Sequence, residues 1–296
     1  MRLWVIANTE LGEKFEEHGE RHLRAALDLG LDAQLINPLD IAIVQQSGSP
    51  PDILTDVRPD VALFLDKDFH LAATLEAIGV KVSNSANSIR TCDDKREMHI
   101  AFSASDIPTP RTVILPRPYP SQPHHPLTLK EAAKRLGFPL VAKASRGSFG
   151  AQVHLVKNND ELIEIFSQND MREAILQELI ETSFGQDIRV HVASDRVICA
   201  IRQKSSGDSL QANLTQGGKG EVIEANEIEI DLALRAARAM GTDFCGVDLL
   251  IGEGGKRLVC EVNSNPHITR LSEITKIDCA TVDILSAIGS DSSPAN

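Results

Sequence analysis

Two apolar runs near the carboxyl end of the chain, Phe244-Cys245-Gly246-Val247-Asp248-Leu249-Leu250-Ile251 and Arg257-Leu258-Val259-Cys260-Glu261-Val262-Asn263, carry side chains that can bind a cation. The segment between them contains Gly252, Gly254 and Gly255, so the stretch predicts a β-hairpin. Alternate side chains of a strand share a face, which directs Glu261 and Asn263 to the same side. Pairing with the first strand can bring Asp248 to them.

The acidic side chains of this hairpin interrupt strands that are otherwise apolar, and such a wall offers them no ordinary partner. Burying an unpaired charge costs several kcal/mol or more, so either the runs are not strands or a cation lies between the acids. Mg²⁺ binds oxygen ligands and is commonly shared between carboxylates and substrate phosphates. The sequence therefore predicts a magnesium site at Asp248, Glu261 and Asn263.

The composition is that of a soluble globular protein. The chain has 296 residues, 42% of them hydrophobic, which is enough for a substantial core divided into about two or three lobes. No apolar run approaches the roughly 20 residues that span a bilayer, so we expect no membrane partner and a cytoplasmic location. The net charge of −12 argues against nucleic-acid binding. The five cysteines include no CxxC pair, and we expect them to be reduced.

Residues 1–90 alternate short apolar strands with helical segments. Strands are expected at 3–7, 33–36 and 61–65, and helices at 15–29 and 71–78. This alternation is typical of a small α/β lobe. No GxGxxG motif follows the first strand, so nothing marks the lobe as a dinucleotide site.

The next segment, residues 91–172, is predicted to form a second lobe. A helix is expected at 88–103, and Ile107-Pro108-Thr109-Pro110 ends it because proline disfavours helix on both sides. Residues 116–126 carry five prolines and two histidines, which favours an extended surface loop over a metal site. A further helix is expected at 129–136.

A glycine-bearing loop, Ala144-Ser145-Arg146-Gly147-Ser148-Phe149-Gly150, connects expected strands at 139–143 and 151–156. It leads into a strand and lacks GK[ST], so a Walker A loop is not supported. Its glycines would still let backbone amides approach phosphate oxygens, and Lys143 and Arg146 add positive charge. A plain hairpin turn is the alternative.

Residues 173–289 are predicted to form an antiparallel α+β lobe, followed by a frayed tail at 290–296. Its expected strands lie at 174–180, 187–193 and 197–203, before the hairpin already described, and its expected helices at 227–240 and 272–288. Together the three lobes predict a mixed α/β and α+β fold.

The order of these motifs resembles that of the ATP-grasp carboxylate–amine ligases, and among them the ribosomal-protein-S6 glutamate ligase (modification enzyme) family. The resemblance covers residues 88–288. The motifs that carry it are Asp94-Lys95, Ile107-Pro108-Thr109-Pro110-Arg111-Thr112, Phe138-Pro139-Leu140-Val141-Ala142-Lys143, Gln177-Glu178, Gly185-Gln186-Asp187-Ile188-Arg189, Ala200-Ile201-Arg202, Ala212-Asn213-Leu214, Gly217-Gly218, Ala236-Ala237-Arg238, Gly246-Val247-Asp248 and Glu261-Val262-Asn263-Ser264-Asn265-Pro266. It implies an ATP-grasp fold with a small N-terminal α/β lobe.

The resemblance also implies roles for individual residues. Asp248, Glu261 and Asn263 would coordinate Mg²⁺, Arg202 and Asn213 would face the transferring phosphate as catalytic residues, and the loop would close over the nucleotide. The implied nucleotide-binding residues are Lys95, Lys143, Arg146, Gly147, Ser148, Phe149, Gly150, Gln177, Glu178, Leu179, Ile180, Asp187 and Arg189. Glu178 and Leu179 would offer backbone groups to adenine, and Asp187 would bind the ribose. Without the resemblance, a solvated surface position is favoured for Lys95, Arg189 and Arg202, and Glu178 and Asp187 would equally pass as surface residues.

The reaction implied is phosphorylation of a carboxylate by ATP, followed by attack of an amine on the acyl phosphate. The expected cofactors are ATP with Mg²⁺ or Mn²⁺, and the expected substrates are an amino acid such as glutamate and an amine-bearing small molecule or peptide. A homo-oligomer is expected by analogy. A nucleotide-binding regulatory or scaffold protein without turnover is the alternative. Gln211, His267 and the segment Leu65-Asp66-Lys67-Asp68-Phe69-His70 depart from the family pattern, which leaves the substrate open.

Overall fold

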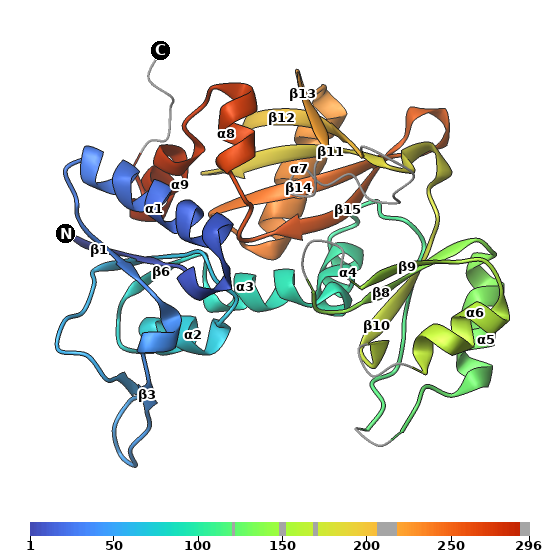
Figure 1. Cartoon of the computed structure of the whole chain (residues 1–296), viewed down its shortest axis with the longest axis horizontal. Helices are drawn as coiled ribbons and strands as arrows, with labels where there is room; N and C mark the ends of the chain where they lie inside the picture. Colours follow the sequence, from blue (N-terminus) through green and yellow to red (C-terminus); the bar gives the residue numbers. More distant parts are fainter. Residues whose placement is uncertain (120–121, 148–151, 168–170, 206–217, 291–296) are drawn as a thin grey trace.

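Three sheets organise the computed structural model, which describes residues 1–119, 122–147, 152–167, 171–205 and 218–290 (Figure 1). The N-terminal sheet is parallel, whereas the middle and C-terminal sheets are antiparallel. Helices cover all three, so the predicted combination of α/β and α+β architecture is confirmed.

The N-terminal sheet has the strand order β2-β1-β5-β6, with β1 (Arg2–Ile6), β2 (Asp32–Ile36), β5 (Val61–Phe64) and β6 (Lys81–Ser83). The helices of this region are α1 (Glu13–Asp28), α2 (Phe69–Ala77) and α3 (Ala86–Asp93). α1 packs on one face of the sheet, and α2 and α3 pack on the other. All four side chains of β5 are therefore buried, as expected for a parallel strand covered on both sides. The predicted strands and helices are confirmed, but β6 was missed because three residues show no clear period.

Short elements complete the N-terminal region. They are η1 (Thr9–Leu11), η2 (Pro38–Asp40), and the two-stranded ribbon of β3 (Ile43–Val44) and β4 (Asp52–Ile53).

The middle sheet has the order β7-β10-β8-β9, with β7 (Thr112–Ile114), β8 (Leu140–Ala144), β9 (Val153–Val156) and β10 (Ala174–Glu178). It packs against α5 (Pro126–Leu136) and α6 (Asn159–Phe166) through a core of its own. The predicted hairpin of β8 and β9 is confirmed, while β7 and α6 were not predicted. The lobe boundaries at residues 90 and 172 stay predictions.

The C-terminal sheet has the order β13-β12-β11-β14-β15, with β11 (Gln186–Ala193), β12 (Arg196–Lys204), β13 (Lys219–Ile223), β14 (Phe244–Ile251) and β15 (Arg257–Asn263). The turns η4 (Glu181–Ser183) and η6 (Glu253–Gly255) flank these strands. α7 (Glu227–Met240) covers one face and has the bounds that the sequence predicted. The predicted hairpin is confirmed, because β14 and β15 pair antiparallel across the glycine turn.

Two predicted helices are each divided in the structure. In place of one helix at 88–103, α3 ends at Asp93 and α4 (Lys95–Ala104) begins after Asp94, whose side chain caps α4 by accepting the amide N–H of Arg96. In place of one helix at 272–288, α8 (Thr269–Thr275) and α9 (Cys279–Ile288) are separated at Lys276, whose φ is 62°. Asp278 then caps α9. Both predictions were wrong because apolar periodicity continued through a capping aspartate.

The N-terminal and C-terminal sheets share a core. α9 lies beside α1 and packs against the N-terminal sheet (Figure 1). Asn84, which is fully buried, donates from Nδ2 to the carbonyl oxygens of Phe244 (2.9 Å) and Ser264 (2.7 Å) and accepts the amide N–H of Asp243 (2.7 Å). These bonds fix the edge of the first sheet against both strands of the predicted magnesium hairpin.

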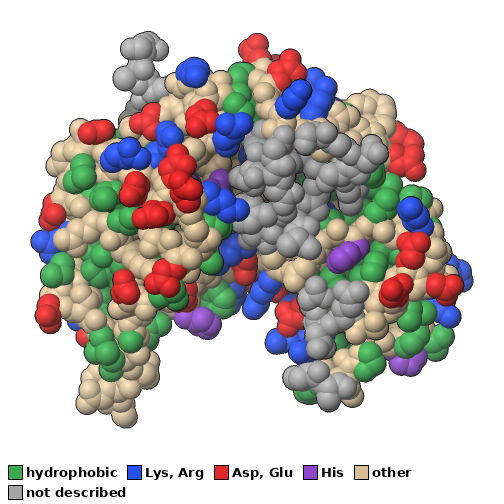
Figure 2. Space-filling model, in the orientation of Figure 1, with side chains coloured by type: hydrophobic (Ala, Val, Ile, Leu, Met, Phe, Trp, Pro, Cys, Tyr) green, Lys and Arg blue, Asp and Glu red, His purple; other side chains and the backbone are tan. Residues whose placement is uncertain are grey.

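The surface is indented between the N-terminal and middle lobes, with Lys and Arg side chains along the edge of the indentation (Figure 2). Across the described parts of the chain, no helix combines the length and apolar character needed to cross a bilayer.

Candidate active site

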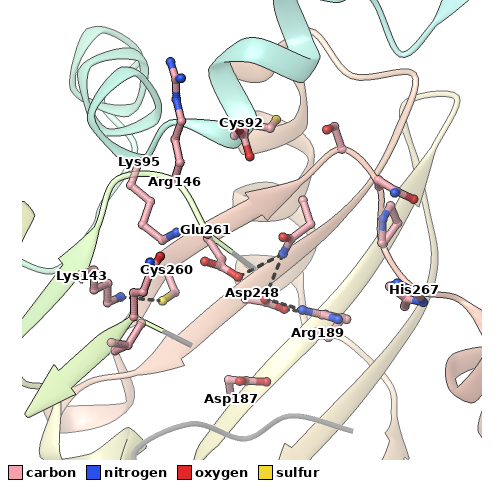
Figure 3. A pocket seen from close by; sticks show the side chains of 18 of the residues that line it. Cys92, Lys95, Lys143, Arg146, Asp187, Arg189, Asp248, Cys260, Glu261 and His267 are labelled. Carbon is pink, nitrogen blue, oxygen red and sulfur yellow. Dashed lines mark hydrogen bonds and ion pairs between the residues drawn. The ribbon is translucent and has the colours of Figure 1, made fainter. Parts of the chain in front are cut away.

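A cavity of about 450 Å³ lies between the three sheets and is lined by residues from each of them (Figure 3). The hairpin of β14 and β15 forms one wall of the cavity. Asp248 lies directly opposite Glu261 in this hairpin, next to an irregularity in the register. Asn263 Nδ2 lies 3.3 Å from Asp248 Oδ2 and 3.2 Å from Glu261 Oε1. The hairpin thus brings the three predicted metal ligands together.

The donor set of this triad fits a hard divalent cation. Two carboxylates and one amide oxygen are the kind of ligands that Mg²⁺ takes, with phosphate oxygens and waters completing the shell. In the described ranges, no three His, Cys, Asp or Glu side chains converge into a metal-binding group. The Asn263 amide now points its N–H groups at both carboxylates and would have to turn for its oxygen to face a cation. Metal binding by the triad stays a prediction.

Asp248 has a partner that the sequence did not reveal. Arg189 donates from Nε to Asp248 Oδ1 (2.7 Å) and from Nη2 to Asp248 Oδ2 (2.6 Å), a bidentate pair that is largely buried. β11 pairs with β14, and the register places Arg189 opposite Asp248. The expectation that an apolar wall gives this carboxylate no ordinary partner was therefore wrong. Strand order across the sheet is a tertiary property, which the hairpin pattern does not contain.

The two carboxylates differ in their charge environment. Burial raises the pKa of Asp248 above its ordinary value, although Arg189 opposes this change. Burial also acts to raise the pKa of Glu261, but Lys95 and Lys143 outweigh it, and the pKa lies below its ordinary value. Glu261 is therefore held ionised by Lys95 and Lys143, which suits a ligand of a divalent cation.

Lys95 and Lys143 reach the cavity from different elements. Lys95 begins α4, and burial lowers the pKa of its ammonium group while Glu261 opposes the shift. Lys143 lies near the end of β8, where Nζ donates to Gln177 Oε1 (2.7 Å) and lies 3.6 Å from Cys260 Sγ. Figure 3 shows both lysines and Arg146 on one side of Asp248 and Glu261, with Arg189 and His267 on the other. The cationic side is the one suited to phosphate groups.

The glycine-bearing loop begins at the same cationic side. Arg146 Nε lies 3.8 Å from Asp94 Oδ2, and both Arg146 and Gly147 line the cavity. Gly147 has φ of +151°, and a Cβ there would lie 2.8 Å from Gln152 Oε1, so the position strongly favours glycine. Ser148, Phe149 and Gly150 lie outside the described residues.

The end of β10 supplies the wall predicted to face adenine. Gln177, Glu178, Leu179 and Ile180 all line the cavity. The Glu178 carboxylate is engaged by Arg111, whose Nε lies 2.6 Å from Oε2, so the side chain is committed to a structural pair. With its side chain engaged in this way, Glu178 can contribute its backbone groups to the predicted adenine site.

Asp187 lies below the triad in Figure 3 and accepts a hydrogen bond from Gln203 Nε2 (2.9 Å). Burial and the nearby Asp248 raise its pKa well above the ordinary value. A hydrogen-bonded carboxyl group at this place is suited to the ribose hydroxyls predicted for it.

Neither of the two predicted catalytic residues is found among the described residues that line the cavity. Arg202 lies in β12 opposite Ile188 and is not among the residues that line the cavity. Asn213 lies outside the described residues. The predicted site residues that do line the cavity are Lys95, Lys143, Arg146, Gly147, Gln177, Glu178, Leu179, Ile180, Asp187, Arg189, Asp248, Glu261 and Asn263.

The sequence marked residues 65–70 and His267 as departures from the family pattern, but it assigned no site role to the side chains on the wall that the N-terminal lobe contributes to the cavity. Phe15 and His18 of α1, Asp66 and Lys67 after β5, and His267 line this part of the cavity. One signal was present, because residues at the carboxyl end of a parallel strand face the crevice where α/β sheets bind ligands. The packing of α1 over this crevice had no such signal.

The buried imidazole of His99 should make the free energy of unfolding of the protein depend on pH. Burial, together with Lys143 and Lys95, lowers the pKa of His99 to about 4. Between that value and the ordinary pKa near 6.5, the unfolded chain takes up a proton that the folded chain does not. The free energy of unfolding should therefore decrease on acidification, by on the order of 1 kcal/mol for this residue between about pH 6.5 and pH 5.

Urea unfolding of the wild type and of His99→Gln at both pH values tests this prediction. Glutamine can still accept from Gln177 Nε2, which lies 3.3 Å from His99 Nε2, but it does not titrate. The wild type should lose more stability on acidification than the variant. Equal losses would show that His99 does not resist protonation in the folded state.

Comparison with known proteins agrees with this geometry. Residues 92–288 match the RimK-like ATP-grasp domain. An uncharacterized protein of Mycoplasma pneumoniae, the MG012 homolog, is 30% identical over 271 residues, which cover 89% of this chain and 90% of that protein. A probable alpha-L-glutamate ligase of Rhodopirellula baltica is 28% identical, with 90% of this chain and 67% of that protein covered. The solved structure of the ATP-grasp ligase PsnB with minimal precursor, Mg and ADP superposes with a TM-score of 0.67 at 17% identity, covering 97% of this chain and 98% of that one.

The cavity between the two antiparallel sheets, together with these matches, identifies an ATP-grasp protein. The fold is an ATP-grasp fold with a small N-terminal α/β lobe, as the sequence predicted. The chain belongs to the RimK-like ATP-grasp domain family.

Proposed function

We propose that the protein is an ATP-dependent carboxylate–amine ligase that forms an amide bond through an acyl phosphate. The single observation that supports this most is the pair of opposed charges in one cavity. Asp248 and Glu261 are brought together with Asn263, and Lys95 and Lys143 influence Glu261 from the other wall. A site of this kind can hold a polyphosphate and its counter-ion between cations and carboxylates.

The residues of the chain would divide the work by position. Lys95, Lys143 and Arg146 would neutralise the phosphate oxygens, and the backbone at Gly147 would approach them closely. Asp248, Glu261 and Asn263 would hold Mg²⁺, which when bound supplies neutralisation of the phosphate charge. Phosphoryl transfer asks a protein mainly for such positioning and charge, so a nucleophilic side chain is not needed.

Arg189 was predicted to bind the nucleotide, and we propose that it also binds the carboxylate that becomes phosphorylated. It lies beside Asp248 on the side of the triad away from the lysines (Figure 3). A guanidinium there could bind the acid next to the transferring phosphate and stabilise the charge that develops. Arg202 and Asn213 remain proposed partners of that phosphate.

The names of the relatives support the proposed substrate class. A relative is named as a probable alpha-L-glutamate ligase, and PsnB was solved with its precursor, Mg and ADP. We extend to this chain glutamate or another amino acid as one substrate and an amine-bearing small molecule or peptide as the other. Mn²⁺ as a substitute for Mg²⁺, a cytoplasmic location and a homo-oligomeric state belong to the same proposal.

Mass spectrometry of the reaction products tests the function. The protein is incubated with ATP, Mg²⁺ and a mixture of the twenty amino acids and short peptides, and amide products and ADP are quantified. The proposal predicts at least one new amide that forms in proportion to ADP and requires both ATP and the metal. Tight ATP binding without ADP across this panel would favour the regulatory or scaffold alternative.

A further inference from the structure

We propose that Asp66 binds the ammonium group of the incoming amine and accepts the proton that this group must lose. The inference rests on the proposed ligase function and names the chemical class of the second substrate, a primary amine that arrives protonated. Asp66 directly follows β5 and lies in the segment of residues 65–70 that departs from the family pattern. It lines the same cavity as the triad.

The other carboxylates that line the cavity each have a side-chain partner. Asp93 pairs with Lys67, Glu178 with Arg111, Asp187 with Gln203, Asp248 with Arg189, and Glu261 with Asn263. In the described part of the chain, Asp66 accepts only from the backbone of its own turn, where Oδ1 lies 2.9 Å from the amide nitrogen of Asp68. Lys67, the adjacent cation, is already bound to Asp93. Among the described residues, Asp66 is therefore the lining carboxylate with negative charge to offer to a cationic substrate.

A hydrogen bond ties the Asp66 turn to the segment that follows the predicted metal ligand Asn263. Asn265, two residues after the predicted ligand Asn263, donates from Nδ2 to the carbonyl oxygen of Leu65 (2.7 Å). The residue after Leu65 is Asp66, so its backbone is held next to the end of β15. An amine bound by Asp66 would therefore lie near the place where the carboxylate is activated.

A second polar group points to the same ligand. Asn265 Oδ1 lies 3.1 Å from Nε2 of His18, and because the amide nitrogen already donates to Leu65, Oδ1 must accept from this imidazole. His18 is 1% exposed and lines the cavity, and its Nδ1 has no hydrogen-bond partner among the described residues. With Nε2 protonated, Nδ1 carries a lone pair, so the same wall holds a buried acceptor with no donor among the described residues.

The electrostatics of this wall favour the same assignment. Burial lowers the pKa of His18 well below its ordinary value, and burial lowers the pKa of His267 to about 4, so neither imidazole competes with a cation at neutral pH. Burial also raises the pKa of Asp66. A carboxylate with a raised pKa is a better proton acceptor than an exposed one.

The proposed step balances in atoms and charge. The ammonium gives one proton to the Asp66 carboxylate, and the nitrogen lone pair then forms the C–N bond to the acyl carbon. The bond from that carbon to the phosphate oxygen breaks, and phosphate leaves with the electron pair. The nitrogen loses its second proton to the leaving phosphate, and Asp66 returns its proton to solvent.

Hydroxylamine separates this role from activation of the acid, because it is uncharged at neutral pH and needs no proton acceptor of this kind. Wild type and Asp66→Asn are compared with ATP, Mg²⁺ and L-glutamate, L-aspartate or their N-acetyl forms as acids. The nucleophiles are hydroxylamine, L-glutamate, L-lysine and glycinamide. The ratio of amide to hydroxamate should fall about 100-fold or more in the variant. Asp68→Asn is the matched control, because Asp68 does not line the cavity. Its side chain caps α2 by accepting backbone N–H groups, and asparagine can accept them too.

Each other result overturns the proposal. A wild type that forms neither hydroxamate nor amide with any acid contradicts the ligase function, and this inference falls with it. Hydroxamate and amide that decrease together in Asp66→Asn would show a structural role, and an unchanged amide rate would show no role. A selective amide loss that Asp68→Asn reproduces would assign the effect to the turn and not to Asp66.

Discussion

Glu261→Gln should lower ATP-dependent turnover by about 10²- to 10³-fold. The substitution keeps the shape of the side chain and removes the charge that faces Lys95 and Lys143. Without this charge, the two lysines lose their counter-charge in the resting site, and the proposed metal loses a ligand. Initial rates of ADP formation at saturating ATP, measured over a range of Mg²⁺ concentrations, provide the test.

Glu253→Gln is the matched control for this experiment. Glu253 lies in the exposed turn of the same hairpin and does not line the cavity. Its replacement by glutamine is the same chemical change as in Glu261→Gln. It should leave turnover close to that of the wild type. If Glu261→Gln retained full turnover at low Mg²⁺, Glu261 would have no part in metal or phosphate binding.

Arg189→Met should lower the free energy of unfolding by about 3–5 kcal/mol, because it leaves the buried carboxylate of Asp248 without its bidentate partner. Methionine retains the length of the apolar stem, so the loss reports mainly on charge. Urea unfolding followed by circular dichroism gives the value directly.

A double-mutant cycle separates the pair from other effects of Arg189. Asp248→Asn removes the charge that would otherwise be unpaired, so the double variant should be more stable than Arg189→Met alone. The coupling energy should exceed about 1 kcal/mol. Strictly additive losses would mean that the bidentate contact contributes nothing specific to the folded state.

Local patterns in the sequence predicted much of the site. The β14–β15 hairpin was predictable because a glycine-rich turn between two alternating strands is a short-range signal, and Asp248, Glu261 and Asn263 lie within it. The strand that ends at Lys143 and the one at Gln177 are also short-range features, and both line the cavity. The motif order then supplied the fold, since it resembled a family whose membership the comparisons confirm.

Contacts between distant segments were not predictable in this way. The pairing of Arg189 with Asp248 depends on β11 lying beside β14, which neither segment specifies alone. The approach of His18 and Asp66 depends on how α1 and the end of β5 pack against the segment after β15. Asp94 was read as part of one helix because its capping role is visible only once the chain turns there. These residues required the tertiary structure.

Oxygen-isotope transfer tests the central claim, formation of an acyl phosphate in this cavity, most directly. The acid identified by the product screen is labelled with ¹⁸O in its carboxylate and incubated with ATP, Mg²⁺ and the amine, and the released phosphate is analysed by mass spectrometry. The account predicts one ¹⁸O atom in each phosphate, in step with ADP and amide, because the carboxylate oxygen leaves with the phosphoryl group. Amide formation with unlabelled phosphate would contradict it.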